Sequence, residues 1–172
     1  FKAWQQLHRE NDLPYRLRCF FTHPNLIDLD QFLALNIQKG FGDDWLSIGG
    51  IKLFADGIGL NAYMAPYDDI KYDLSEFEEL VYKAHSHNLQ VWAHATTKPA
   101  YDMVLKAYQE AQRRLFIADA RLRMEHGGER LTFYNMPADD IKIFKDNSIL
   151  PMSTPQFSYN FLNHETNFAS YI

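Results

Sequence analysis

Short apolar runs recur along the chain and predict a series of β-strands. Turn-forming residues bound most of these runs, as expected for strands buried in a sheet. The runs start 28 to 39 residues apart, which is the spacing of strand–helix units in α/β folds. The predicted strands cover residues 17–21, 50–55, 89–94, 120–125 and 148–152.

Between these runs, apolar residues repeat at helical spacing. The clearest helix follows Ser75 and Glu78, which form a capping-box pattern. Thr97 is the expected N-cap of the next helix, with Pro99 in its first turn. Pro137 begins a later helix whose apolar stripe carries Ile141 and Phe144. Two further helices are predicted at about residues 1–12 and 29–38.

The alternation of strands and helices indicates βαβ units and a parallel sheet. The chain is therefore predicted to be α/β, either an open doubly wound sheet or part of a (β/α)8 TIM barrel. No glycine-rich phosphate fingerprint follows any strand, which disfavours a nucleotide-binding doubly wound fold. Five strands cannot close a barrel, and the chain starts at Phe1 without a methionine. We therefore expect residues 1–172 to be a single incomplete barrel domain.

Charge and composition narrow the classes of partner. The net charge is −5 and there is no basic cluster, which argues against nucleic acid as the main partner. No apolar run approaches the roughly 20 residues that span a bilayer, and no signal peptide is visible, so we expect no membrane association. The single cysteine, Cys19, cannot form an internal disulfide. Cysteine use therefore leaves the compartment undetermined, with the cytoplasm as the default expectation.

One charged residue interrupts the most apolar strand. Ile51 and Leu53 share one face of this strand, whereas Lys52 points to the other. A lysine in a buried strand is costly unless it is paired, neutral or chemically modified. Lys52 is thus either a structural anomaly or a functional residue.

Polar residues cluster where the predicted strands end. In an α/β barrel, the carboxyl ends of the strands form the catalytic face. Imidazoles at that face suit a zinc-like ion, although a single histidine at a strand end is more often structural. The polar residues at these ends are His23, Lys52, Asp56, His94, Glu125, His126 and Gln156.

Several of these residues have simpler interpretations. Asp56 is suited to making the turn after its strand. Glu125 points away from His126 and is expected to pair with Arg123, Arg121 or a neighbouring strand. His23 lies before Pro24, in a segment that also suits an ordinary loop.

Three short motifs carry a family resemblance. They are IKLFADG at residues 51–57, VWAHA at residues 91–95 and RLRMEHG at residues 121–127. In this order and spacing they resemble the metal-dependent amidohydrolase superfamily, in the branch of N-substituted formamide deformylases (amidohydrolase family 3). Members of that branch show K-hydrophobic-F-x-D-G, then HA, then R-hydrophobic-E-H. The resemblance covers roughly residues 15 to 156.

The resemblance implies a hydrolase barrel with one or two divalent ions, expected to be zinc, at its mouth. Lys52 would be the lysine of barrel strand four, carboxylated and bridging two ions, so the chain would span about strands three to seven. His94 and His126 would be metal ligands from strands five and six, and Asp56 is a second catalytic candidate. Metal-activated water would attack a carbon–nitrogen bond of the non-peptide amide type in a small molecule. The expected substrate contacts are His23, Lys98 and Gln156.

Some family features are missing or altered. The His-x-His pair of strand one and the aspartate of strand eight would lie outside residues 1–172, so we expect these residues alone to be inactive. The His-Ser-His sequence at residues 85–87 lies at a helix C-terminus, the wrong end of a barrel, and is interpreted as a surface feature that favours the helix dipole. Lys98 stands where the family often has aspartate. A degenerate, non-catalytic binding protein is therefore the alternative hypothesis.

Overall fold

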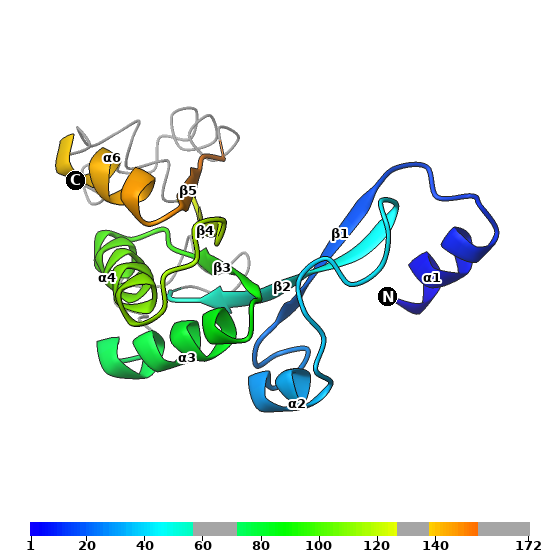
Figure 1. Cartoon of the computed structure of the whole chain (residues 1–172), viewed down its shortest axis with the longest axis horizontal. Coiled ribbons are helices and arrows are strands. Elements are labelled where there is room, and N and C mark those ends of the chain that lie inside the picture. The colour runs from blue at the N-terminus through cyan, green and yellow to red at the C-terminus, as the bar shows by residue number, and fades with distance from the viewer. Residues whose placement is uncertain (57–71, 127–137, 155–172) are drawn as a thin grey trace, which may run out of the picture.

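The computed structural model describes residues 1–56, 72–126 and 138–154. The strands form one parallel sheet in the order β1-β2-β3-β4-β5. Each strand lies beside the strand that precedes it in the sequence (Figure 1). Their bounds are Leu17–Thr22 for β1, Leu46–Phe54 for β2, Gln90–His94 for β3, Leu122–Glu125 for β4 and Ile149–Met152 for β5.

The direction of winding distinguishes the two predicted architectures. A doubly wound sheet reverses its strand order at a switch point, whereas successive units of a (β/α)8 barrel add to the same edge. The order of the described strands never reverses. The α/β prediction is therefore confirmed, and the winding matches the barrel alternative. The assignment to barrel strands three to seven stays a prediction.

Helices connect the strands and cover one side of the sheet. The long helices α3 and α4 lie side by side against the central strands (Figure 1). None of the helices in the described ranges is long and apolar enough to cross a membrane. The helix bounds are Lys2–Arg9 for α1, Leu29–Ala34 for α2, Leu74–Ser86 for α3, Lys98–Arg114 for α4 and Ala138–Asp146 for α6.

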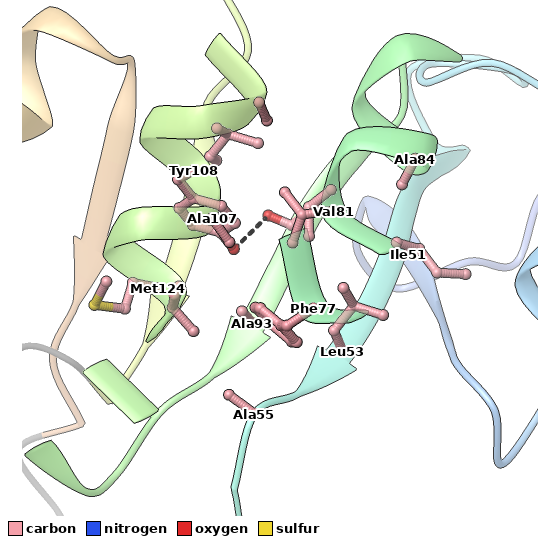
Figure 2. Close-up of a cluster of buried hydrophobic side chains, with 14 of the residues drawn as sticks. Ile51, Leu53, Ala55, Phe77, Val81, Ala84, Ala93, Ala107, Tyr108 and Met124 are labelled. Atoms are coloured by element: carbon pink, nitrogen blue, oxygen red, sulfur yellow. Dashed lines mark hydrogen bonds between the residues drawn. The ribbon is translucent and has the colours of Figure 1, made fainter. Parts of the chain in front are cut away.

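The hydrophobic core fills the space between the sheet and these helices. Ile51 and Leu53 of β2, and Ala55 directly after it, are fully buried on the helix-facing side of the sheet. They gather with Phe77 and Val81 of α3 in one cluster (Figure 2). Burial contributes about 1.5–3 kcal/mol for each large apolar side chain. The orientation of β2 is therefore set by its apolar face.

The opposite face of the sheet carries polar and aromatic side chains. Residues paired across neighbouring parallel strands project to the same face of the sheet. Each set of paired residues therefore forms a row of side chains across the strands. This is the face that would line the interior of a barrel. The two rows nearest the strand ends are Lys52, Trp92 and Arg123, then Phe54, His94 and Glu125.

A bulge in β2 explains why the strand begins earlier than predicted. Consecutive glycines at positions 49 and 50 have low strand propensity, so the prediction began only at about residue 50. The register between β1 and β2 shifts here, with Gly49 as the extra residue. The bulge reverses the alternation, so Ile48 and Ile51 both join the core although they are three positions apart. The ring of Phe20 occupies the space over Gly49, 2.2 Å from where a Cβ atom would lie.

The helix starts are partly as predicted. Thr97 is the N-cap of α4, as expected, and its side chain accepts a hydrogen bond from the first turn. The capping box predicted at Ser75 and Glu78 is wrong, because Asp73 and Glu76 form it instead. An aspartate oxygen accepts hydrogen bonds with a full negative charge, which also suits the positive end of the helix. Ser75 instead donates to the Asp73 carboxylate at 2.8 Å.

Two other helices differ from expectation. α2 ends at Ala34 rather than near residue 38. Asn36 adopts a left-handed backbone conformation with φ 52°, which ends a helix. In α6, Phe144 is buried as predicted, but Ile141 is 59% exposed. The predicted apolar stripe of α6 is therefore narrower in the structure.

We expect Gly49→Ala to destabilise the protein, because the new Cβ would displace the Phe20 ring. That ring stacks on Trp92 with centroids 3.6 Å apart. The free energy of unfolding should fall by about 1–3 kcal/mol, as for other overpacked sites, and urea denaturation measures it. Adding Phe20→Leu should recover part of the loss. Strictly additive losses in the double variant would contradict this packing account.

Candidate functional site

Three of the predicted site residues lie at the same edge of the sheet. Lys52, His94 and His126 come from the carboxyl ends of β2, β3 and β4, which are consecutive neighbours. The rings of His94 and His126 are in edge-to-face contact, with centroids 4.6 Å apart. The Lys52 side chain projects from the same face, one row below His94. The structure therefore brings together residues that are far apart in the sequence.

Burial keeps both imidazoles neutral. It lowers the pKa of His94 to about 3, and the nearby His126 and Lys52 side chains lower it further because like charges repel. Burial, followed by the positive charge of Lys52, lowers the pKa of His126 to about 4. A metal binds the neutral form of histidine through a ring nitrogen. At physiological pH both rings are therefore in the form that a metal requires.

Lys52 is also shifted towards its neutral form. Burial lowers the pKa of its amine to about 8, against the opposing attraction of the Glu125 carboxylate. The Lys52 Nζ atom lies 5.0 Å from the centroid of the Phe54 ring. A lysine in such surroundings carries an accessible neutral amine, which is the nucleophilic form.

His126 has an unusual backbone for a non-glycine residue. Its φ is 65°, in the left-handed region. Its Nδ1 atom lies 2.7 Å from the Oγ1 atom of Thr154, which follows β5. Strained backbone often occurs at functional sites, where the surrounding structure holds it in place. The conformation turns the His126 side chain towards His94 although the residue lies beyond the end of β4.

Asp56 links the end of β2 to the loop after β3. Its carboxylate is only 2% exposed. It accepts hydrogen bonds from the Thr96 N–H and hydroxyl and from the Thr97 N–H, the last at 2.7 Å. Its Oδ1 atom lies 3.7 Å from Nε2 of His94. Asp56 therefore does more than make a turn, because it joins two strand ends beside the histidine pair.

An aromatic and cationic stack lies beneath these residues, and sequence reasoning did not identify it. The Arg123 guanidinium lies 3.6 Å from the centroid of the Trp92 ring, which also stacks on Phe20. Arg123 donates to Glu125 at 2.7 Å, which confirms the predicted pairing. One sequence signal could have found it. Trp92 lies two residues before His94, and Arg123 lies two residues before Glu125, so each pair projects to the same face of its strand. Trp92 and Arg123 lie in the same row as Lys52, so the stack flanks the lysine side chain on the inner face of the sheet.

Two of the three predicted substrate contacts lie in the described residues, and one of them, His23, directly follows β1 and donates its backbone N–H to the Lys52 carbonyl at 3.0 Å. His23 is buried, and its Nδ1 atom accepts a hydrogen bond from the backbone N–H of Leu29 at the start of α2. Lys98 lies in the first turn of α4 and forms an exposed ion pair with Asp102. Gln156 lies outside the described residues. A role in substrate binding stays a prediction for all three.

The surface interpretation of the His-Ser-His sequence is wrong for His85. This residue is 1% exposed, and its Nε2 atom lies 2.7 Å from the carbonyl oxygen of Leu115 at the end of α4. Burial lowers its pKa, so the ring does not act as a cation at the helix terminus. His87 is exposed and bonds the Lys83 carbonyl of its own helix, as a surface residue would. Packing of α3 on α4 explains the difference, because it buries only one of the two rings.

Comparison with known proteins agrees with the fold and the motifs. Residues 1–142 match the sequence model of the amidohydrolase family. The chain belongs to the amidohydrolase family. The predicted resemblance is thus confirmed at the level of the family, while the formamide deformylase branch stays a prediction.

Two individual proteins are similar to this amidohydrolase chain. The crystal structure of an uncharacterized metal-dependent hydrolase from Pyrococcus furiosus superposes with a TM-score of 0.66 and 27% sequence identity, covering 92% of this chain and 32% of that one. Protein LONG AFTER FAR-RED 3 from Arabidopsis thaliana is 32% identical over 107 residues, covering 56% of this chain and 18% of the relative. The chain therefore spans less than a third of each protein's length.

The donor set at the strand ends fits a divalent cation. The described residues include no group of three or more His, Cys, Asp or Glu side chains arranged to hold a metal. The set instead consists of two neutral imidazoles in contact, with the Lys52 amine nearby. The Nε2 atom of His94 is buried and has no hydrogen-bond partner within the described ranges. Two neutral imidazoles beside a lysine amine of lowered pKa are nitrogen donors of the kind that such a cation takes.

We expect the metal-free protein to lose stability as the pH falls from about 6.5 towards 4. The pKa values of His94 and His126 are lower in the folded state, so the unfolded chain takes up protons first and acid favours unfolding. Urea denaturation at several pH values in the presence of a chelator measures the effect. His126→Gln should flatten the pH dependence, whereas His87→Ala should not. A pH-independent wild-type stability between 6.5 and 4 would contradict the neutral-imidazole account.

Proposed function

We propose that this protein is a metal-dependent hydrolase that cleaves a carbon–nitrogen bond of the non-peptide amide type in a small molecule. The convergence of Lys52, His94 and His126 at one edge of the sheet is the observation that supports this proposal. Membership of the amidohydrolase family and similarity to the Pyrococcus hydrolase support the hydrolase class. The proposed substrate group is an N-substituted formamide or a related amide, as in the branch that the three motifs resemble.

One or two divalent ions are proposed to be held by His94, His126 and Lys52. Zinc is the expected metal, because imidazole nitrogen is one of its preferred ligands. A bound ion would polarise the substrate carbonyl and lower the pKa of water. Burial keeps the two imidazoles unprotonated, so the site needs no proton release from them at neutral pH. The Arg123–Trp92 stack lies in the row of Lys52, one level below His94.

Lys52 is proposed to act as a carbamate. Its neutral amine would attack the carbon of carbon dioxide and release one proton from Nζ, which leaves an anionic oxygen donor. Burial favours the amine form that this addition requires. The modification would also remove the cost of a buried ammonium, so it accounts for a lysine in this strand.

A non-catalytic binding protein stays the alternative hypothesis. It depended on Lys98, which replaces a common aspartate of the family. Lys98 instead forms an exposed ion pair with Asp102 on its own helix. The metal and hydrolysis measurements below decide between the two hypotheses.

We expect Lys52→Ala and His126→Ala to remove metal and hydrolysis together, because each deletes a proposed ligand. Metal content is measured by atomic emission, and hydrolysis by formate release from N-substituted formamides, both on the complete natural polypeptide. His87→Ala is the matched control, since this histidine is exposed and bonds only within its helix among the described contacts. Unchanged metal content in both ligand variants would refute the proposed centre. Full metal content without formate release, but with cleavage of another bond type, would refute the substrate class.

A further inference from the structure

The Asp56 carboxylate is held in a fixed orientation by the loop after β3. Its Oδ2 atom accepts from the Thr97 N–H at 2.7 Å and from the Thr96 hydroxyl at 3.0 Å. The Thr96 N–H lies 3.1 Å from each of the two carboxylate oxygens. These donors come from a segment forty residues away in the sequence, and Asp56 is almost completely buried. The direction in which Oδ1 points is therefore set by the fold.

That direction is towards His94. Oδ1 lies 3.7 Å from Nε2 of the imidazole, and both side chains are buried. The Nε2 atom has no hydrogen-bond partner within the described residues. The separation is longer than a hydrogen bond, but such contacts are often long before a site is loaded. A small rotation of the ring would close it.

A metal-binding histidine usually donates its second ring N–H to a carboxylate or carbonyl, which fixes the tautomer and the ring orientation. We propose that Asp56 is the positioning residue of this site: its Oδ1 atom receives the Nε2–H of His94 and leaves Nδ1 for the cation. This inference rests on the proposed function, because the cation is part of it. Asp56 would thus act through His94 and not on the substrate, unlike the catalytic role considered from the sequence.

The tautomer of His94 can be measured without any substitution. The complete natural polypeptide is labelled with ¹⁵N-histidine and prepared without metal, and the ring ¹⁵N shifts report which nitrogen carries the proton. The His94 signals are assigned from their absence in His94→Gln. The expected result is a proton on Nε2. A proton on Nδ1 in the wild-type protein would overturn the proposal.

Asp56→Asn should reverse the tautomer. The Thr97 N–H and the Thr96 hydroxyl both donate, so the asparagine carbonyl must face them and its NH2 group must face His94. That group would donate to Nε2 and move the proton to Nδ1, where it blocks the cation. The affinity for zinc, measured by competition with a chelating dye, should fall about 10- to 100-fold.

Thr96→Val is the matched control, because it removes one hydrogen bond to Asp56 and keeps the charge facing His94. It should lower the melting temperature as Asp56→Asn does, yet leave the tautomer and the zinc affinity near wild type. An equal loss of affinity in both variants would make Asp56 a purely structural residue and overturn the proposal. Absence of zinc binding by the wild-type protein would refute the proposed function itself, whereas the ¹⁵N shifts still decide the role of Asp56.

Discussion

The apolar face of β2 is the constraint on which the rest of the site depends. Ile51, Leu53 and Ala55 are buried against the helices, and their removal from water fixes the rotation of the strand. Because side chains alternate, Lys52 must then project to the opposite face. The parallel arrangement places the ends of β3 and β4 beside it. The site therefore follows from hydrophobic burial on the other side of the sheet.

Burial also determines the chemistry that these residues can perform. An imidazolium or ammonium is disfavoured away from water, so His94, His126 and Lys52 all have lowered pKa values. The same groups repel one another when they are charged, which strengthens the effect. A cluster of three basic side chains is stable only when its members are neutral or when a ligand compensates them. The arrangement therefore leaves the two imidazoles unprotonated at neutral pH and makes the Lys52 ammonium easier to deprotonate.

Two sets of contacts between strands hold the candidate site in place. The stack of Phe20, Trp92 and Arg123 spans from β1 to β4 on the inner face. It depends on Gly49, since any larger residue at the bulge would collide with the Phe20 ring. Asp56 makes the corresponding connection at the strand ends, between β2 and the loop after β3. The first flanks Lys52 in its row, and the second lies 3.7 Å from the His94 ring.

The sequence by itself determined the alternation of strands and helices, the parallel α/β class and the choice of Lys52, His94 and His126 as candidate donors, because these depend on local periodicity and on motif order. It also placed the N-cap of α4 correctly at Thr97. Only the tertiary structure revealed the bulge at Gly49, the burial of His85 and the hydrogen bonds of Asp56. Each depends on contact between segments distant in the chain, and local pattern carries no information about which distant side chains will meet. Tertiary packing therefore determines which distant residues come into contact.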